Sequence, residues 1–127
     1  MKHTNNLLKG FTHAYSGFTY ACRERNVRFH LAATICVLIA ASMLPLSPIE
    51  WAFILSAIAF VLVAEFLNTS IEMLCDVITR DYSIPIKKIK DIAAASVLLS
   101  ALYALAIAFL ILYPKLLNLY LSNLLYI

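Results

Sequence analysis

Four polar side chains of this sequence recur at the spacing of one helical face. Glu65, Asn68, Glu72 and Asp76 are separated by steps of three, four and four residues. At about 100° per residue, these steps predict a polar stripe about 80° wide that rises roughly 16 Å along a helix. Carboxylates on one face repel each other unless protons or a cation lie between them, and Mg²⁺ binds carboxylate oxygens together with phosphates. The stripe therefore predicts a site for a cation or a proton, which would serve catalysis or ion transport.

Glu65 is the member of this stripe that is hardest to explain without a function. It directly follows the uncharged residues 51–64, and a carboxylate at membrane depth must face protein or water because exposure to lipid is costly. The alternative is an acidic helix end paired with the arginines of residues 23–28, which would account well for Asp76 and adequately for Glu72. It accounts poorly for Glu65, so we expect a functional acidic site.

The composition indicates a membrane protein. The chain has 127 residues, of which 63% are hydrophobic and 13% charged, against about 45–50% and about 25% in ordinary globular domains. Its two glycines, Gly10 and Gly17, exclude a Walker A loop and a Rossmann fingerprint, which each need several glycines at fixed positions. The net charge of +3 is too small to suggest nucleic-acid binding.

The apolar runs predict an all-α membrane protein with three transmembrane helices in a single domain of residues 1–127. Residues 5–28 have an apolar aromatic face with basic residues elsewhere, which predicts an amphipathic helix on the membrane surface. The transmembrane helices are expected at about 29–46, 51–78 and 92–113, the second with a cytoplasmic extension. We expect a polar loop at 79–91, the end of the last helix at Pro114, and a tail over 114–127.

The basic residues predict the orientation in the membrane. They concentrate in residues 2–28 and in the 79–91 loop, whereas the turn at 45–50 has none. The positive-inside rule therefore places the N-terminus and this loop in the cytoplasm, with Lys115 the one basic residue on the opposite side. The first long apolar run begins near Leu31, after a polar and basic start, so we expect no cleavable signal peptide.

The stripe also resembles a family signature. The segment from Glu65 to Asp76 resembles the pattern E-x-x-N-[ST]-[AS]-I-E-x-x-x-D of the prokaryotic diacylglycerol kinase family. The Lys90-Asp91 pair, fourteen residues later, matches that family's Lys-Asp pair in register. The Glu24–His30 stretch resembles the Gram-positive-type branch of the family, whose members phosphorylate undecaprenol.

This resemblance, which covers about residues 8–113, implies a small lipid kinase of the bacterial inner membrane. It implies a homotrimeric helical bundle of three-transmembrane-helix subunits, each with an N-terminal surface helix. It further implies active sites near the cytoplasmic interface that are built from more than one subunit. ATP and Mg²⁺ are the implied cofactors, and a lipid alcohol and the surrounding membrane lipids are the implied partners.

The resemblance also implies a role for each site residue. Glu65 resembles the general base that acts on the lipid hydroxyl, and Glu24 and Glu72 resemble the metal-binding carboxylates. The implied nucleotide-contacting positions are Asn68, Asp76, Lys90 and Asp91. The chemistry of the stripe agrees, because phosphoryl transfer needs an oriented hydroxyl, a metal ion and positive charge near the phosphates.

The sequence departs from the family pattern in three places. Residues 93–96 are small, but they lack the glycine that the family usually has there. The segment Asp81-Tyr82-Ser83 stands where Glu-Tyr-His is more usual, and the tail after Pro114 is longer than we expect. The first two departures leave the named site residues intact, and the third concerns the opposite end of the molecule.

The sequence therefore predicts ATP-dependent phosphorylation of a membrane lipid alcohol, with undecaprenol as the preferred substrate and undecaprenyl phosphate as the product. A diacylglycerol kinase that makes phosphatidic acid is the alternative enzyme. A small proton or cation channel, or a purely structural assembly subunit, would contain the same stripe, but neither needs the Lys90-Asp91 pair or a nucleotide.

Overall fold

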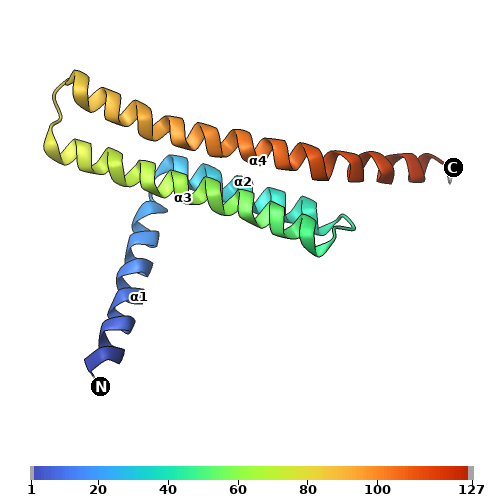
Figure 1. Ribbon diagram of the computed structural model, residues 1–127, viewed down its shortest axis with the longest axis horizontal. Helices are drawn as coiled ribbons and strands as arrows, with labels where there is room; N and C mark the ends of the chain where they lie inside the picture. The colour runs from blue at the N-terminus through green and yellow to red at the C-terminus, as the bar shows by residue number, and fades with distance from the viewer. Residues whose placement is uncertain (1, 126–127) are drawn as a thin grey trace.

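The computed structural model describes the backbone of residues 2–125 and the side chains of residues 7–122. This part of the chain forms four helices and no strand, which confirms the all-α prediction. The helices are α1 (Lys2–Ala21), α2 (Arg25–Ser42), α3 (Pro48–Ile78) and α4 (Ile84–Leu125). Helices α3 and α4 form an antiparallel hairpin, α2 packs against α3, and α1 leaves the bundle at a steep angle (Figure 1).

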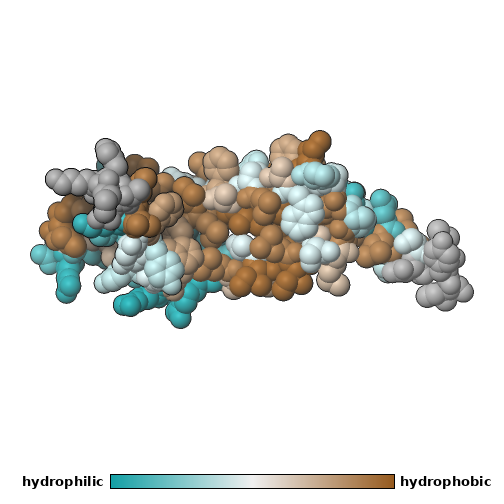
Figure 2. Space-filling view, turned by 90° about the horizontal axis from the view of Figure 1, so that it is seen from below, coloured by the Kyte–Doolittle hydropathy of each residue, from teal (hydrophilic) through white to brown (hydrophobic). Residues whose placement is uncertain are grey.

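Two of the helices are long and apolar enough to cross a membrane. They are α3 and α4 over Ile84–Ser122, which contain 18-residue stretches with mean hydropathies of 2.0 and 2.5 respectively. Figure 2 shows a hydrophobic band over the middle of the bundle and most of the hydrophilic residues toward one end. Helix α2 has 18 residues and a polar first turn, so its role as a third transmembrane helix stays a prediction.

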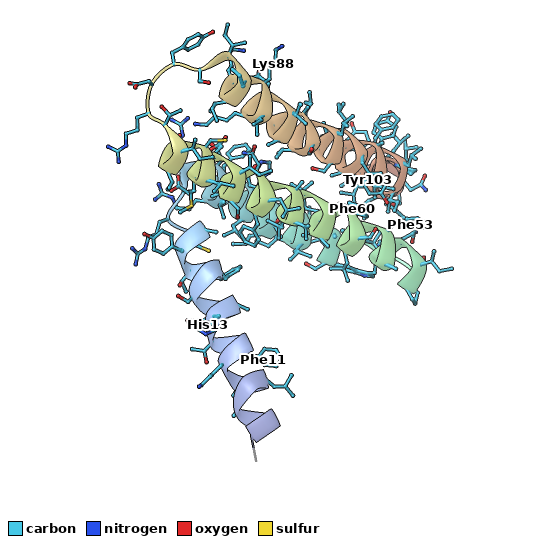
Figure 3. All side chains as sticks on the ribbon, turned by 60° about the vertical axis from the view of Figure 1, so that its left-hand side comes forward. Phe11, His13, Phe53, Phe60, Lys88 and Tyr103 are labelled. Atoms are coloured by element: carbon cyan, nitrogen blue, oxygen red, sulfur yellow. The ribbon has the colours of Figure 1, made fainter. Side chains whose placement is uncertain are left out.

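The contact between α3 and α4 depends on small side chains. Ala57 on α3 and Ala93 on α4 are buried, and small residues let the backbones of membrane helices approach closely. Phe60 of α3 and Tyr103 of α4 meet edge to face, with ring centroids 5.8 Å apart (Figure 3). The close packing of this hairpin fixes the rotation of α3, and with it the direction of its polar stripe.

Helix α3 begins at a capping box. Ser47 Oγ accepts a hydrogen bond from the Glu50 amide (3.3 Å), and Glu50 Oε2 accepts one from the Ser47 amide (2.7 Å). Pro48 occupies the first turn, where its missing N–H has no cost. Such a cap contributes about 1 kcal/mol to helix stability and sets the start of α3.

The first expected boundary is wrong. A single surface helix over 5–28 was predicted, but the chain breaks at residues 22–24, where Glu24 takes an extended conformation and α2 begins at Arg25. No glycine or proline marks this break. Phe18 of α1 meets Phe66 of α3 edge to face (centroids 5.7 Å apart), which places the end of α1 against α3.

The expected loop over 79–91 is also shorter than predicted. Helix α3 ends at Ile78 and α4 begins at Ile84, so the loop is limited to residues 79–83. Pro85 lies in the first turn of α4, where backbone N–H groups have no partner within the helix, so it starts a helix here instead of preventing one.

The expected helix end at Pro114 is wrong as well. Helix α4 continues through Pro114 to Leu125, beyond the ends of the other helices (Figure 1). Proline removes one backbone hydrogen bond, but in apolar surroundings the helix still satisfies more backbone groups than an irregular chain does. Lys115 also holds this segment, because its Nζ donates to the Pro45 carbonyl (3.0 Å) and pairs with Glu50 Oε1 (3.3 Å).

Candidate active site

The polar stripe of α3 faces a small cavity between three helices. This cavity, which we call the stripe cavity, has a volume of about 230 Å³. Helix α3 contributes Glu65, Asn68 and Glu72, α2 contributes Asn26 and His30, and two apolar residues of α4 complete the wall. The structure therefore brings together three of the four stripe residues and adds two polar side chains from another helix.

Glu65 is the most deeply buried charged residue of the stripe cavity. Only 2% of it is exposed, and its Oε1 atom has no hydrogen-bond partner among the described residues. The nearest basic group is His30, whose Nε2 lies 3.8 Å from Glu65 Oε2. This separation is longer than a hydrogen bond, so the two groups are neighbours that form an ion pair only when the imidazole is protonated. Oε1 of Glu65 is thus a buried acceptor that no described group of the chain uses.

Asn68 provides a second free acceptor in the same cavity. Its Nδ2 atom donates to Glu72 Oε1 (3.1 Å), which fixes the side-chain amide and leaves Oδ1 buried without a partner. A buried polar atom without a hydrogen bond costs about 1–3 kcal/mol, so native proteins keep few of them. Two free acceptors in one cavity of this size indicate that a donor from outside the chain completes the site.

A second polar region lies at the loop between α3 and α4. Asp76 and Lys90 form an ion pair at 2.5 Å across the hairpin, and Lys87 pairs with Asp91 at 2.7 Å along α4. Lys90, Asp76 and Lys87 line an open hollow of about 650 Å³, which we call the loop hollow. The hydrogen bond to Asp76 raises the pKa of Lys90, which keeps the ammonium charged. Ligand pockets commonly have volumes of roughly 300–1,000 Å³, so the loop hollow is large enough for a nucleotide.

The two expected metal ligands do not share a cavity in a single chain. Glu72 lines the stripe cavity, whereas Glu24 is exposed at the break before α2 and is not part of that wall. Within the described residues, no group of three His, Cys, Asp or Glu side chains is arranged to hold a metal ion. The oxygen atoms of the stripe nevertheless have the chemistry that Mg²⁺ prefers, and Mg²⁺ commonly uses only one or two carboxylates together with substrate phosphates.

The alternative in which arginines neutralise the stripe is not seen. Among the described side chains, none of the ion pairs within 4.0 Å includes an arginine. Arg23 instead lies over the ring of Tyr20, 5.2 Å from its centroid. The burial of Glu65 therefore has no compensation from the basic N-terminal residues.

Sequence reasoning missed two residues of the stripe cavity. Asn26 and His30 are separated by four residues on α2, so they share one face of that helix and point toward the α3 stripe. This spacing is visible in the sequence, but nothing local indicates which face of α2 meets α3.

Comparison with known proteins adds independent information. The sequence model of the family described as prokaryotic diacylglycerol kinase matches residues 12–112. An undecaprenol kinase of Bacillus subtilis is 41% identical over 113 residues, which cover 88% of this chain and 92% of that protein. A diacylglycerol kinase of Synechocystis sp. is 37% identical over 116 residues, which cover 90% of this chain and 66% of that protein. All three matches include the stripe cavity and the loop hollow.

Proposed function

The chain belongs to the prokaryotic diacylglycerol kinase family and is a membrane lipid kinase that uses ATP; we propose that the lipid it phosphorylates is undecaprenol. The relative named undecaprenol kinase is the more similar of the two and is covered almost completely, which supports this choice. The Glu24–His30 stretch, which resembles the undecaprenol-phosphorylating branch, supports it as well. Diacylglycerol is the second candidate, supported by the relative of that name.

The observation that carries the mechanism is the buried Glu65 carboxylate with one free oxygen. We propose that Glu65 is the general base. The O–H bond of the lipid alcohol breaks as its oxygen bonds to the γ-phosphorus of ATP, and the proton passes to Glu65. The bond from the γ-phosphorus to the bridging oxygen breaks, and its electron pair leaves with ADP. A base held within the stripe cavity is sheltered from water, which would otherwise compete as the acceptor.

We propose that Mg²⁺ is held by Glu72 and Glu24 together with the phosphates. Carboxylate oxygens suit this ion, and its charge offsets the negative charge of the phosphates. Glu72 is already oriented by Asn68, which donates to one of its oxygens. Because Glu24 lies outside the stripe cavity of a single chain, we propose that the complete metal site forms only in the assembled protein.

The loop hollow is the proposed nucleotide site. Lys90, Lys87 and Arg80 surround it, and basic side chains offset the charge of phosphates in the absence of a glycine-rich loop. Asp76 and Asp91 position Lys90 and Lys87 respectively through ion pairs. Together with Asn68, which lines the stripe cavity and not the hollow, these residues form the proposed ATP-contacting group.

The proposed assembly is a homotrimer in the bacterial inner membrane. Each subunit would have α2, α3 and α4 as transmembrane helices, α1 on the membrane surface and its N-terminus in the cytoplasm. The exposed apolar face of α1, with Phe11 at 75% and Tyr15 at 72% exposure, supports the surface placement. The concentration of basic residues in residues 2–28 and 80–90 supports the orientation.

A substrate comparison tests the proposed function. Purified protein receives ATP and Mg²⁺ with undecaprenol or diacylglycerol, and the lipid products are separated and quantified. We expect undecaprenyl phosphate, with a higher kcat/KM for undecaprenol than for diacylglycerol. A higher kcat/KM for diacylglycerol would establish the second candidate, and no product from either lipid would overturn the proposal.

A further inference from the structure

His30 is the basic side chain that lies closest to the buried end of the polar stripe. It projects from α2 into the stripe cavity, and 19% of its side chain is exposed, against 3% for Glu65. Among the described residues, it is the one basic group within 4.0 Å of Glu65. The ring also contacts Phe29 edge to face, with centroids 5.5 Å apart, which restricts its rotation.

The two oxygens of Glu65 have different surroundings. Oε2 faces His30, whereas Oε1 is buried without any partner. A carboxylate that rotated freely would exchange these atoms and present neither of them reliably to a substrate. A hydrogen-bond donor to one oxygen prevents this rotation of the carboxylate. The other oxygen then points in a fixed direction.

No other side chain of the stripe cavity forms a hydrogen bond with Glu65. Asn26, the other polar residue of α2 in the wall, is exposed and has no side-chain hydrogen bond among the described residues. Glu72 is acidic and its Oε1 is engaged with Asn68, and Asn68 directs its amide donor at Glu72 rather than at Glu65. The α4 wall consists of Ala94 and Val97, which have no polar side-chain atoms. The orientation of Glu65 therefore depends on α2, and on His30 in particular.

We propose that His30 is the positioning residue for Glu65: its Nε2–H holds Oε2, so that Oε1 is presented to the hydroxyl of the lipid alcohol. His30 Nε2 now lies 3.8 Å from Glu65 Oε2, and a small movement of either side chain brings the two atoms within hydrogen-bond distance. Catalytic contacts commonly tighten in this way when substrate binds. The inference rests on the proposed general-base role of Glu65. It adds no chemical step, because the proton of the lipid hydroxyl still passes to Oε1.

Three variants of His30 test the proposal. His30→Phe and His30→Met replace the imidazole by an apolar side chain of similar size that has no donor. His30→Gln places an amide donor near the position of Nε2. We expect the two donor-less variants to lower kcat about 10- to 100-fold, because a small misplacement of a reacting group has a cost of this size. The KM values for ATP and lipid should change less than about threefold. His30→Gln should restore kcat to within about threefold of the original protein.

The control is His13→Gln, since His13 lies exposed on α1, far from the stripe cavity (Figure 3). It should leave all kinetic constants unchanged. Each variant is also checked for assembly by size-exclusion chromatography in detergent. If the two donor-less variants fail to assemble, His30→Gln decides alone: near-normal kcat supports the proposal, and a large loss overturns it.

A double variant separates positioning from direct substrate contact. If His30 acts only through Glu65, adding His30→Phe to Glu65→Gln should lower the residual rate no further, because the residue to be positioned is already disabled. A further loss of tenfold or more would overturn the positioning role. Original protein that phosphorylates no lipid would contradict the proposed function itself, whereas an active enzyme with fully active His30→Phe would contradict only this inference.

Discussion

Glu65 Oε1 and Asn68 Oδ1 are hydrogen-bond acceptors without donors in a cavity too small for a nucleotide. In the proposed function, this space receives the lipid hydroxyl, which brings one hydrogen-bond donor. The loop hollow has the opposite character, since it is open and surrounded by paired charges. In the proposed function, the acceptor alcohol and the donor phosphates would occupy these two regions of different polarity.

Replacement of Glu65 tests the proposed activation of the lipid alcohol. Glu65→Gln keeps the shape of the side chain but cannot accept the proton, so we expect kcat to fall about 10²- to 10⁴-fold. The measurement is the steady-state rate with undecaprenol and saturating ATP. Glu50→Gln is the matched control on the same helix, because glutamine also serves in a capping box. A rate for Glu65→Gln close to that of the control would remove Glu65 from the base role.

Replacement of Lys90 tests the proposed binding of the ATP phosphates in the loop hollow. Lys90→Met removes the ammonium that Asp76 holds in the loop hollow, and we expect the KM for ATP to rise about tenfold, which corresponds to the loss of roughly 1.4 kcal/mol. An ATP titration at saturating lipid measures the effect. Lys88→Met is the control, because Lys88 is exposed on the same turn of α4 but does not line the hollow (Figure 3). Equal KM values in both variants would exclude a specific role for Lys90.

At the scale of the elements, α3 connects the capped turn, the helix hairpin and both polar regions. Its 31 residues extend about 46 Å, well beyond the roughly 30 Å of the hydrocarbon core. The excess length explains how one helix carries both an apolar span and a polar stripe. The capping box at Ser47 fixes the start of α3 at the end opposite the polar stripe.

The cap gives a stability prediction. Ser47→Ala should lower the free energy of unfolding by about 1 kcal/mol, measured by denaturant titration in detergent. The value of kcat should stay unchanged, because the cap lies at the opposite end of α3 from Glu72. Ser56→Ala is the control, since Ser56 bonds only to the Phe53 carbonyl within the same helix. Equal stability of both variants would show that the cap is dispensable.

The helices were more predictable than their ends. The uninterrupted run through Glu65 to Ile78 predicts one long helix, and the structure confirms it. The sequence predicts a loop that includes Pro85 and a helix end at Pro114, but the cost of proline depends on its position in the helix and on the polarity around it. The start of α3 is also visible in the sequence, because Ser47 and Glu50 have the three-residue spacing of a capping box.

The polar site was predictable within one helix and not across helices. Periodicity places Glu65, Asn68 and Glu72 on one face because the helix geometry is fixed. The approach of His30 depends on the rotation of α2 against α3, which local spacing does not determine. The position of Glu24 depends on the break at residues 22–24, which no glycine or proline marks in the sequence.

At the scale of the whole molecule, a single chain leaves much of its apolar surface without protein contact. The outward-facing side chains of α3 and α4 are mostly large and hydrophobic, and a groove of about 780 Å³ between these helices is lined mainly by such residues. Lipid covers such surface in a membrane, and a second subunit covers it equally well. The separation of Glu24 from the stripe cavity is the feature that favours shared sites in a trimer.

A mixing experiment tests the shared site. Glu24→Gln and Glu65→Gln subunits are each expected to be nearly inactive. If one subunit supplies Glu24 and another supplies Glu65, reassembly of both variants together should form some sites with both carboxylates, and activity should return. Each variant reassembled with itself is the control. Mixtures that stay as inactive as these controls would show that every subunit contains a complete site.

The pairing of Lys115 with Glu50 has a consequence for biogenesis. Among the side chains of residues 42–52 and 113–127, these two are the only charged ones in the sequence. In the proposed topology, this end of the hairpin is carried across the bilayer during insertion. The charges of Lys115 and Glu50 are opposite, so translocation of this end transfers no net side-chain charge. The basic residues at the other end of the hairpin keep that end on the cytoplasmic side, where the protein is synthesised.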